Sequence, residues 1–210
     1  MKSMQFTDQL TIFTRYPEPG LTKTRLIGAL GKDGAAKLQK ELTEKTVQKI
    51  DQLAKTSTAE PVIYFEGGDL ASMQNWLGHE RLYKPQGHGN LGEKLKKAFG
   101  DAFSAGAQRV VTIGCDCPDL NKEHIGRAFD ALYLKDLVLG PATDGGYYLI
   151  GMQRPLDGLF EDIPWGTDKV FETTVSLAQQ LGLSIEILQE LRDVDRPEDL
   201  EHINYHPNPE

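Results

Sequence analysis

The chain has 210 residues, enough for one domain with a buried core, and 39% of them are hydrophobic. Its formal net charge of −8 argues against a protein that coats nucleic acid or an anionic membrane, and no apolar run approaches the ~20 residues of a membrane span. The two cysteines, Cys115 and Cys117, are poorly spaced for a structural disulfide, and we expect no signal peptide because the first residues lack an apolar core segment. We therefore expect a cytoplasmic protein with reduced thiols.

Short apolar runs alternate with stretches of helical period along the chain. The runs predict strands at 10–14 and 61–65, in "RVVTIG", on both sides of the glycine turn in "DLVLGPATDGGYYLIGM", and at "SIEIL". Helices are predicted at 33–54, from 91 onward, at 121–132 with Asn121 as its cap, at 167–181 with Gly182 as its stop, and at "DVDRPEDL". This alternation predicts an α/β domain with a mostly parallel sheet and one antiparallel departure at the glycine turn.

The loop after the first predicted strand, "YPEPGLTKTRL", carries two cations, Lys23 and Arg25. A turn needs proline and glycine, here Pro19 and Gly20, but it needs no cations, and a helix start favours acids. Ligands of open α/β sheets bind beyond the carboxyl ends of the strands, so these cations could contact phosphate groups. The spacing fits neither a P-loop nor a dinucleotide fingerprint, and solvated surface cations are the alternative.

Two carboxylates, Asp116 and Asp119, follow the buried strand in "VVTIGCDCPDL". A carboxylate just beyond a strand is well placed to hold Mg²⁺, which takes oxygen ligands from few carboxylates and from substrate phosphates. Strand alternation puts Cys115 and Cys117 on one face and Asp116 on the other, which favours small packing residues over a thiolate metal site. For Asp119 we favour a role in a turn or a helix start.

The later acidic residues have structural explanations of their own. Asp195 followed by Glu198 in "DVDRPEDL" matches a helix cap, while Asp193 has no assigned role. Asp144 lies on the glycine turn of "TDGGYYL", where a tight hairpin is sufficient to explain it. None of these residues requires a ligand on the evidence of its local sequence.

Six motifs occur in a familiar order: "FTRYPEPGLTKTRL", "QGHGNLGEKLKKAF", "IGCDCPDL", "LGPATDGGYYLIGM", "IPWGT" and "DVDRPEDL". In order and spacing they resemble a bacterial GT-A-like group of the nucleotide-diphospho-sugar transferase superfamily, often labelled selenodomain-associated transferase or glycosyltransferase. The group is similar to molybdenum-cofactor guanylyltransferase and phospholactate guanylyltransferase. The resemblance spans roughly Leu10 to Leu200. One departure is Cys115 and Cys117, where the group usually has small residues such as serine, and we expect this to alter packing rather than chemistry.

The resemblance implies a single three-layer α/β/α domain over 1–210, with its core at about 10–203 and a Rossmann-like GT-A fold with a mostly parallel mixed sheet. It implies that Lys23 and Arg25 contact phosphates, that Asp116 binds Mg²⁺ (or Mn²⁺), and that Asp195 is a second metal ligand. The other residues that it implies for nucleotide binding are Pro19, Gly20, Gln86, Gly89, Asn90, Gly92, Gly145 and Gly146.

Three functions follow as hypotheses. The first is nucleotidyl transfer, in which a phosphate oxygen of a small metabolite attacks an NTP and pyrophosphate leaves; an ionised nucleophile needs no general base. The second is glycosyl transfer from a nucleotide-sugar to a small hydroxyl acceptor, with Asp144 as the base. The third is a nucleotide sensor without catalysis. Lys23, Arg25 and Asp116 favour an enzyme, and the local residues favour the first function; a homodimer is left open.

Overall fold

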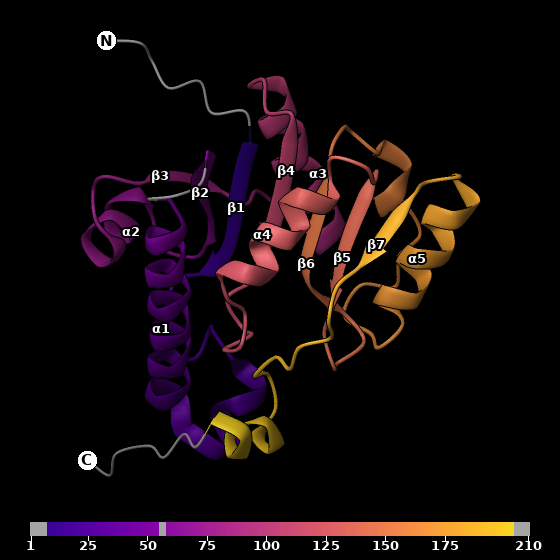
Figure 1. Ribbon diagram of the computed structural model, residues 1–210. Coiled ribbons are helices and arrows are strands. Elements are labelled where there is room, and N and C mark those ends of the chain that lie inside the picture. Colours follow the sequence, from indigo (N-terminus) through magenta and orange to yellow (C-terminus); the bar gives the residue numbers. More distant parts are fainter. Residues whose placement is uncertain (1–7, 55–57, 204–210) are drawn as a thin grey trace.

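The computed structural model describes residues 8–54 and 58–203, which contain a seven-stranded sheet in the order β3-β2-β1-β4-β6-β5-β7 (Figure 1). β6 is antiparallel to both of its neighbours, and the other neighbouring pairs are parallel. The predicted mixed sheet with one antiparallel departure is therefore confirmed. The strands are β1 (Asp8–Arg15), β2 (Ala59–Glu66), β3 (Leu82–Pro85), β4 (Arg109–Ile113), β5 (Leu137–Pro141), β6 (Tyr147–Met152) and β7 (Ile185–Ile187).

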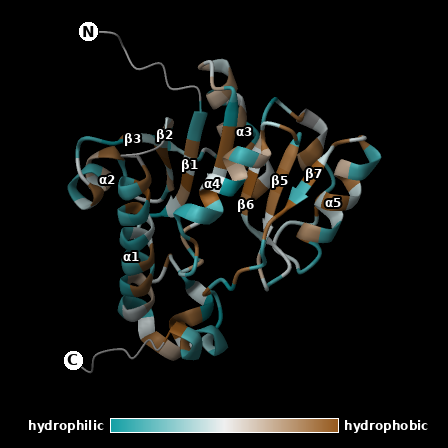
Figure 2. Cartoon of the chain, viewed as in Figure 1, coloured by the Kyte–Doolittle hydropathy of each residue, from teal (hydrophilic) through white to brown (hydrophobic). Residues whose placement is uncertain are grey.

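Helices cover both faces of this sheet and bury one core on each side. Apolar residues of α1, α2 and α4 pack on one face, and those of α3 and α5 pack on the other, which gives the expected three layers. Hydrophobic residues line the strands, while the outer sides of the helices are hydrophilic (Figure 2). The helices are α1 (Ile27–Ala54), α2 (Leu70–Leu77), α3 (Leu91–Ser104), α4 (Lys122–Ala131) and α5 (Val170–Gln180).

Several helix boundaries differ from the sequence prediction for local reasons. The first helix begins at Ile27 rather than at 33, with a break at Gly31 (φ 70°). The fourth is capped by Asn121 as predicted. α5 begins at Val170 instead of Thr167, because the Thr167 hydroxyl accepts from Lys169 N and donates to the Pro164 carbonyl in a preceding turn.

The sheet brings four segments together at one edge (Figure 1). β1, β4 and β5 end there and β6 begins there, because only β6 runs in the opposite direction. A C-terminal segment then crosses this edge: Leu191 bridges to Ala142, and Val194 N donates to the Asp116 carbonyl at 2.9 Å. The last segment is a 3₁₀ helix, Pro197–Ile203. Within the described residues, no helix is both long and apolar enough to cross a membrane.

Candidate functional site

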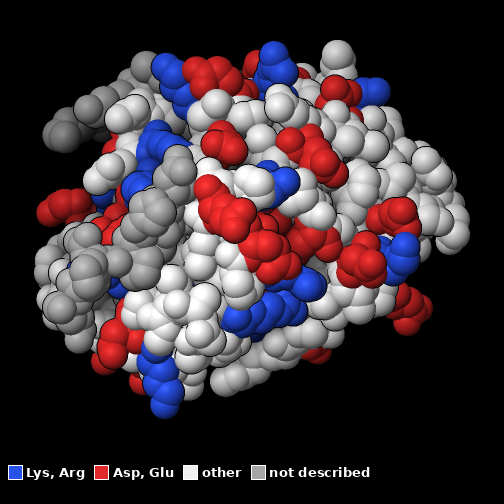
Figure 3. All heavy atoms as spheres, turned by 90° about the horizontal axis from the view of Figure 1, so that it is seen from below, with Lys and Arg blue, Asp and Glu red and all other residues white. Residues whose placement is uncertain are grey.

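Two cavities open at the carboxyl edge and share a wall that includes Asp116, Arg25 and Leu91. The first cavity, about 470 Å³, is called the basic cavity here for its three cations, Arg15, Lys23 and Arg25. Three carboxylates, Glu66, Asp116 and Asp195, also line it, and each forms an ion pair with one of these cations. The second cavity, about 480 Å³, is lined by aromatic as well as charged side chains, and it is called the aromatic cavity here. Seen from this edge, acidic side chains gather beside basic ones (Figure 3). The residues that give the aromatic cavity its character are Asp144, Tyr147, Tyr148, Trp165, Asp193 and Arg196.

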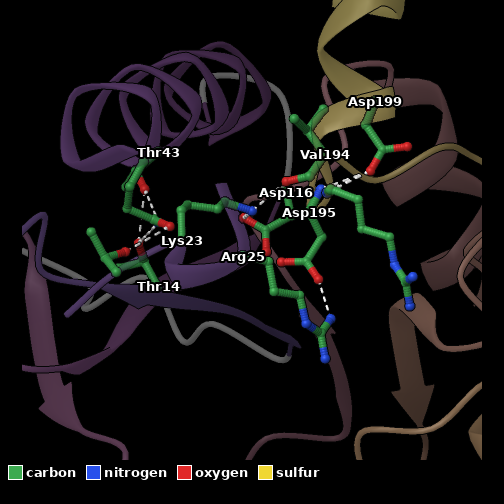
Figure 4. A network of polar contacts seen from close by, with 11 residues as sticks. Thr14, Lys23, Arg25, Thr43, Asp116, Val194, Asp195 and Asp199 are labelled. Atoms are coloured by element: carbon green, nitrogen blue, oxygen red, sulfur yellow. Dashed lines mark hydrogen bonds and ion pairs between the residues drawn. The ribbon is translucent and has the colours of Figure 1, made fainter. Parts of the chain in front are cut away.

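Lys23 is a buried cation that joins three segments of the chain (Figure 4). It lies in the left-handed region (φ 47°, ψ 44°), and its side chain is only 3% exposed. The ammonium group contacts Asp116 Oδ1 at 2.8 Å and donates to the Val194 carbonyl at 2.5 Å. Lys23 is thus not a solvated turn cation. It ties the loop after β1 to the loop after β4 and to the C-terminal segment.

Arg25 forms a second ion pair, with Asp195. Their side chains are 55% and 26% exposed, so this pair is accessible to solvent. Asp195 therefore uses its carboxylate on Arg25 rather than as a helix cap. The capping contacts come from Asp199 instead, whose Oδ2 accepts from the backbone N–H groups of Asp195 (3.1 Å) and Arg196 (2.8 Å).

A network of buried polar side chains supports the loop that carries these two cations. Thr22 in the loop donates to Gln39 Oε1 at 3.3 Å, and Gln39 Nε2 donates to Thr43 Oγ1 at 3.1 Å. The Thr43 hydroxyl also contacts the hydroxyl of Thr14, at the end of β1, at 2.8 Å. All four side chains are almost completely buried, so these contacts fix the loop against β1 and α1.

Gln86 lines the basic cavity, where it contacts both β1 and β2. Its Nε2 donates to the carbonyls of Thr14 (3.0 Å) and Tyr64 (3.1 Å). The amide nitrogen of Gln86 therefore holds β1 and β2 together at the cavity. Nucleotide contact by Gln86 stays a prediction.

The glycine-rich stretch before α3 has a capping function. Asn90 accepts from Glu93 N at 3.0 Å, and Glu93 Oε2 accepts from Asn90 N at 2.8 Å. Gly89 (φ 96°) leaves room for the Glu93 carboxylate, which would lie 2.0 Å from an added Cβ. Gly92 lies under the Trp165 indole, 2.7 Å from an added Cβ. Packing therefore accounts for these glycines, and nucleotide contact remains a prediction for them.

The turn between β5 and β6 borders the aromatic cavity. Asp144 Oδ1 accepts from Gly146 N at 2.8 Å, so Asp144 shapes the tight turn that the sequence suggested. Gly145 (φ 86°) packs closely on the next loop, because an added Cβ would lie 2.2 Å from the Asp168 carbonyl oxygen. By contrast, Pro19 and Gly20 line neither of the two cavities.

Asp193 and Trp165 are site residues that the sequence analysis did not select. Burial, together with the nearby Asp144 and Asp116 carboxylates, raises the pKa of Asp193 to about 6. The Trp165 ring packs edge-to-face with Tyr147 at a centroid distance of 6.4 Å. The "IPWGT" motif was a signal for Trp165, whereas nothing local distinguishes Asp193 from a surface acid.

The carboxylates of the site suit a hard metal ion, although they do not form a ready cage. Among residues 8–54 and 58–203, no group of three or more His, Cys, Asp or Glu side chains is placed to hold a metal. Asp116 and Asp195 each contact a cation instead. Mg²⁺ commonly takes one or two carboxylates and completes its shell with water and phosphate oxygens, so this donor set fits it.

Cys115 and Cys117 are both free and buried. Burial raises the pKa of the Cys115 thiol to about 12 and also raises that of Cys117. A thiol must lose its proton to become a good metal ligand or nucleophile, so this environment supports the packing role predicted from the sequence.

A third cavity, about 510 Å³, lies away from this edge between α1, β2 and β3. Apolar side chains such as Val47, Ile63 and Leu82 line much of it, and it contains none of the predicted site residues. The two cavities that meet at Asp116 are therefore the candidate site.

Comparison with known proteins gives one family match and many similar structures. A model of the family described as "Uncharacterized protein conserved in bacteria (DUF2064)" matches residues 49–167. The search of curated proteins finds no match. A crystal structure from Desulfovibrio desulfuricans G20, described as a "putative nucleotide-diphospho-sugar transferase", is 33% identical, with a TM-score of 0.82 over 96% of this chain and 89% of that one.

More distant structures share the fold. The 4-diphosphocytidyl-2C-methyl-D-erythritol synthase from Anaerococcus prevotii DSM 20548 is 12% identical, with a TM-score of 0.60 over 97% of this chain and 98% of that one. Glucosyl-3-phosphoglycerate synthase from Mycobacterium tuberculosis, in complex with Mn²⁺, UDP and its product, is 12% identical, with a TM-score of 0.59 over 94% of this chain and 75% of that one.

Proposed function

This chain belongs to the bacterial family DUF2064. From the geometry of its site and its 33% identity to a structure described as a "putative nucleotide-diphospho-sugar transferase", we propose that it is a nucleotide-dependent transferase that moves a nucleotidyl group to a small acceptor. The observation that carries the proposal is the position of Asp116, on the wall shared by a basic and an aromatic cavity. A transferase needs this arrangement, because donor and acceptor must meet at one point.

We place the phosphate chain of the nucleotide in the basic cavity. Lys23 and Arg25 supply positive charge there, and Gln86 and the capped start of α3 lie beside it. Charge-assisted contacts to phosphate are the strongest that such a cavity offers. The acceptor then occupies the aromatic cavity, where Trp165 provides an apolar surface and Arg196 a cation.

Asp116, together with Asp195, would hold Mg²⁺ in this proposal. The ion would neutralise charge on the phosphates, which is the main requirement of phosphoryl chemistry. Beside the metal site, Lys23 and Arg25 bind the two phosphates that leave as pyrophosphate. The bond that forms joins an acceptor oxygen to the α-phosphorus, and the bond that breaks joins that phosphorus to the bridging oxygen. An acceptor phosphate is already ionised and requires no base.

Glycosyl transfer is the second candidate, because two observations favour it. The 33% identical structure is described as belonging to a nucleotide-diphospho-sugar transferase. The aromatic cavity also holds two carboxylates, Asp144 and Asp193, that could accept a proton from a hydroxyl acceptor. The 12% identical structures share the fold with both kinds of enzyme, so the preference for nucleotidyl transfer rests on the residues of the site.

A ligand screen followed by product analysis tests the proposal. NTPs and nucleotide-sugars are screened by thermal shift with and without Mg²⁺ or Mn²⁺, since a ligand at 100 times its Kd adds about 2.7 kcal/mol of stability. The best donor is then incubated with phosphorylated and hydroxylated acceptors. Release of pyrophosphate supports nucleotidyl transfer, and release of a nucleoside diphosphate supports glycosyl transfer. Stabilisation by neither class of donor would contradict both.

Three further parts of the proposal come from the sequence. We propose Mg²⁺ as the resident ion, a cytosolic location and a small-molecule acceptor. The cytosolic location rests on expectations from the sequence, namely the low cysteine content and no recognisable signal peptide. A homodimer stays an open prediction, which light scattering on the purified protein would test.

A further inference from the structure

Each cation proposed to bind phosphate is paired with a carboxylate proposed to bind metal. Lys23 contacts Asp116, and Arg25 contacts Asp195 (Figure 4). The two pairs link the loop after β1 to two segments that are distant in sequence. Arg196 lines the aromatic cavity with Asp116 and Asp193, yet it shows no ion pair within the described residues. Arg15, the third cation of the basic cavity, is paired as well, with Glu66, so pairing is common to all three cations of that cavity, and only the Lys23 and Arg25 pairs involve the proposed metal ligands.

We propose that these two ion pairs weaken the binding of a free divalent ion to Asp116 and Asp195, so that the site binds metal and phosphate together. We call this effect the guard. The inference rests on the proposed function for the identity of the ligand. Its core claim, that Lys23 and Arg25 hold the two carboxylates away from free metal, depends only on the contacts in the structure.

The Lys23 pair provides the stronger part of this guard. The Lys23 side chain is 3% exposed and also donates to the Val194 carbonyl, so the ammonium group is held in place at the wall of the basic cavity. A divalent ion that approached Asp116 alone would meet a fixed positive charge. A phosphate chain that arrives with the ion gives the ammonium group a new anionic partner. The metal in turn compensates Asp116, so both charges remain satisfied.

The same logic applies in reverse to a nucleotide without metal. Its phosphates would approach Lys23 and Arg25 against the neighbouring carboxylates of Asp116 and Asp195. Binding free energies are linked, so the factor by which nucleotide improves metal affinity equals the factor by which metal improves nucleotide affinity. The ligand recognised is then the metal–nucleotide complex, rather than either component.

The test measures Mn²⁺ alone, without nucleotide, by the loss of its free signal in electron paramagnetic resonance. Wild-type protein is compared with Lys23→Met and Arg25→Met, which remove the cations and leave the carboxylates. Arg196→Met is the matched control, because it removes a cation from the cavity wall without releasing either carboxylate. Melting temperatures establish that each variant is folded.

We expect Lys23→Met to bind Mn²⁺ about tenfold more tightly than wild type and Arg25→Met about two- to fivefold more tightly, since its pair is exposed. Arg196→Met should stay within about twofold of wild type, because it breaks no pair. Equal affinity in wild type and Arg25→Met overturns the proposal, as does an equal gain in Arg196→Met, which would show a general charge effect. If Lys23→Met fails to fold, the comparison of Arg25→Met with Arg196→Met decides the outcome.

This result is independent of the proposed function. Tighter Mn²⁺ binding by the two variants supports the guard even if no nucleotide stabilises the protein. Conversely, if nucleotide binds but Lys23→Met and Arg25→Met have the same Mn²⁺ affinity as wild type, the proposed transferase function stands and the guard is rejected.

Discussion

Lys23 and Asp116 form an ion pair of 2.8 Å in which the cation is buried and the carboxylate is half exposed, at 3% and 46%. This asymmetry means that the fold fixes the lysine and leaves the aspartate facing the two cavities. If the lysine is lost, the Asp116 carboxylate can still be solvated, because it is half exposed. If the aspartate is lost, the buried Lys23 ammonium group keeps only the Val194 carbonyl as a partner. Variants of the two residues should therefore behave differently.

Asp116→Asn is expected to abolish Mg²⁺-dependent nucleotide binding and leave the fold intact. A neutral amide oxygen is a poorer ligand for a hard cation, but it can still accept a hydrogen bond from Lys23. Isothermal titration with Mg²⁺ present measures the loss, and circular dichroism monitors the fold. Asp119→Asn is the control, since Asp119 lies on the same loop but lines neither cavity. Equal affinity in Asp116→Asn and the parent would remove Asp116 from the metal site.

Lys23→Ala and Arg25→Ala should each weaken triphosphate binding and leave free-nucleoside binding nearly unchanged. Charge-assisted contacts are worth ~1.5–3 kcal/mol, so we expect a loss of roughly 10- to 150-fold. Arg25→Lys should also lose affinity, because a guanidinium can hold two phosphate oxygens at once. Titration with nucleoside, monophosphate and triphosphate separates the effects. The arginine variant is the cleaner one, because Lys23 is buried. A uniform drop for all three ligands would mean that the loop does not recognise phosphate.

Cys115→Ser combined with Cys117→Ser should retain nucleotide binding. Both thiols are buried, and the hydroxyls of Thr14 and Thr43 lie beside Cys115, where a serine can find partners. In the parent protein we expect slow reaction with a thiol reagent at neutral pH, because burial raises the pKa of Cys115 to about 12. Bound zinc in the purified parent, lost together with activity in the double variant, would reject the packing role.

The sequence predicted the fold well where a pattern is local and repeated. The alternation of strands and helices indicated the mixed sheet, and the two strands around Gly145 indicated its antiparallel member. Gly182 ends α5 as predicted, with φ 68° and Leu183 N donating to the Ala178 carbonyl. α2 and β3 escaped prediction because they have only eight and four residues and so offer few repeats of a pattern. In α2 the apolar residues Leu70, Met73, Trp76 and Leu77 do follow the helical spacing, over barely two turns.

The site was predictable only in part, because its contacts join distant segments. Strand ends meet at one edge of a sheet, so the neighbourhood of Lys23 and Asp116 follows from their loops. The contact between Lys23 and Val194 spans 171 positions and depends on how the C-terminal segment crosses that edge. Likewise, Thr22 and Gln39 look like ordinary polar residues until the fold buries them together.

Asp193→Asn should stabilise the protein at neutral pH and lose this advantage in acid. The pKa of Asp193 is raised to about 6, from 3.8, by burial and by Asp144, so its ionised form is disfavoured in the folded state. The folded state then binds more protons than the unfolded state between about pH 4 and 6, and the parent loses stability as the pH rises through that window. We expect the variant to gain about 1–2 kcal/mol at pH 7.5 and little at pH 4. Urea unfolding at both values without Mg²⁺ measures this, and a pH-independent difference would contradict the raised pKa.

Gly145→Ala should destabilise the protein more than Gly166→Ala, although both glycines have nearly the same positive φ. Their φ angles are 86° and 83°, so alanine costs roughly 1–2 kcal/mol at either position. Only at Gly145 would the new Cβ meet the backbone, 2.2 Å from the Asp168 carbonyl oxygen; at Gly166 the space is open. The β5–β6 turn would have to move away from the loop before α5, and with it the wall of the aromatic cavity. Urea unfolding of the two variants isolates this packing contribution from the shared conformational cost. Equal losses of stability would mean that the turn relaxes freely, and the close packing of Gly145 would then not hold the cavity in shape.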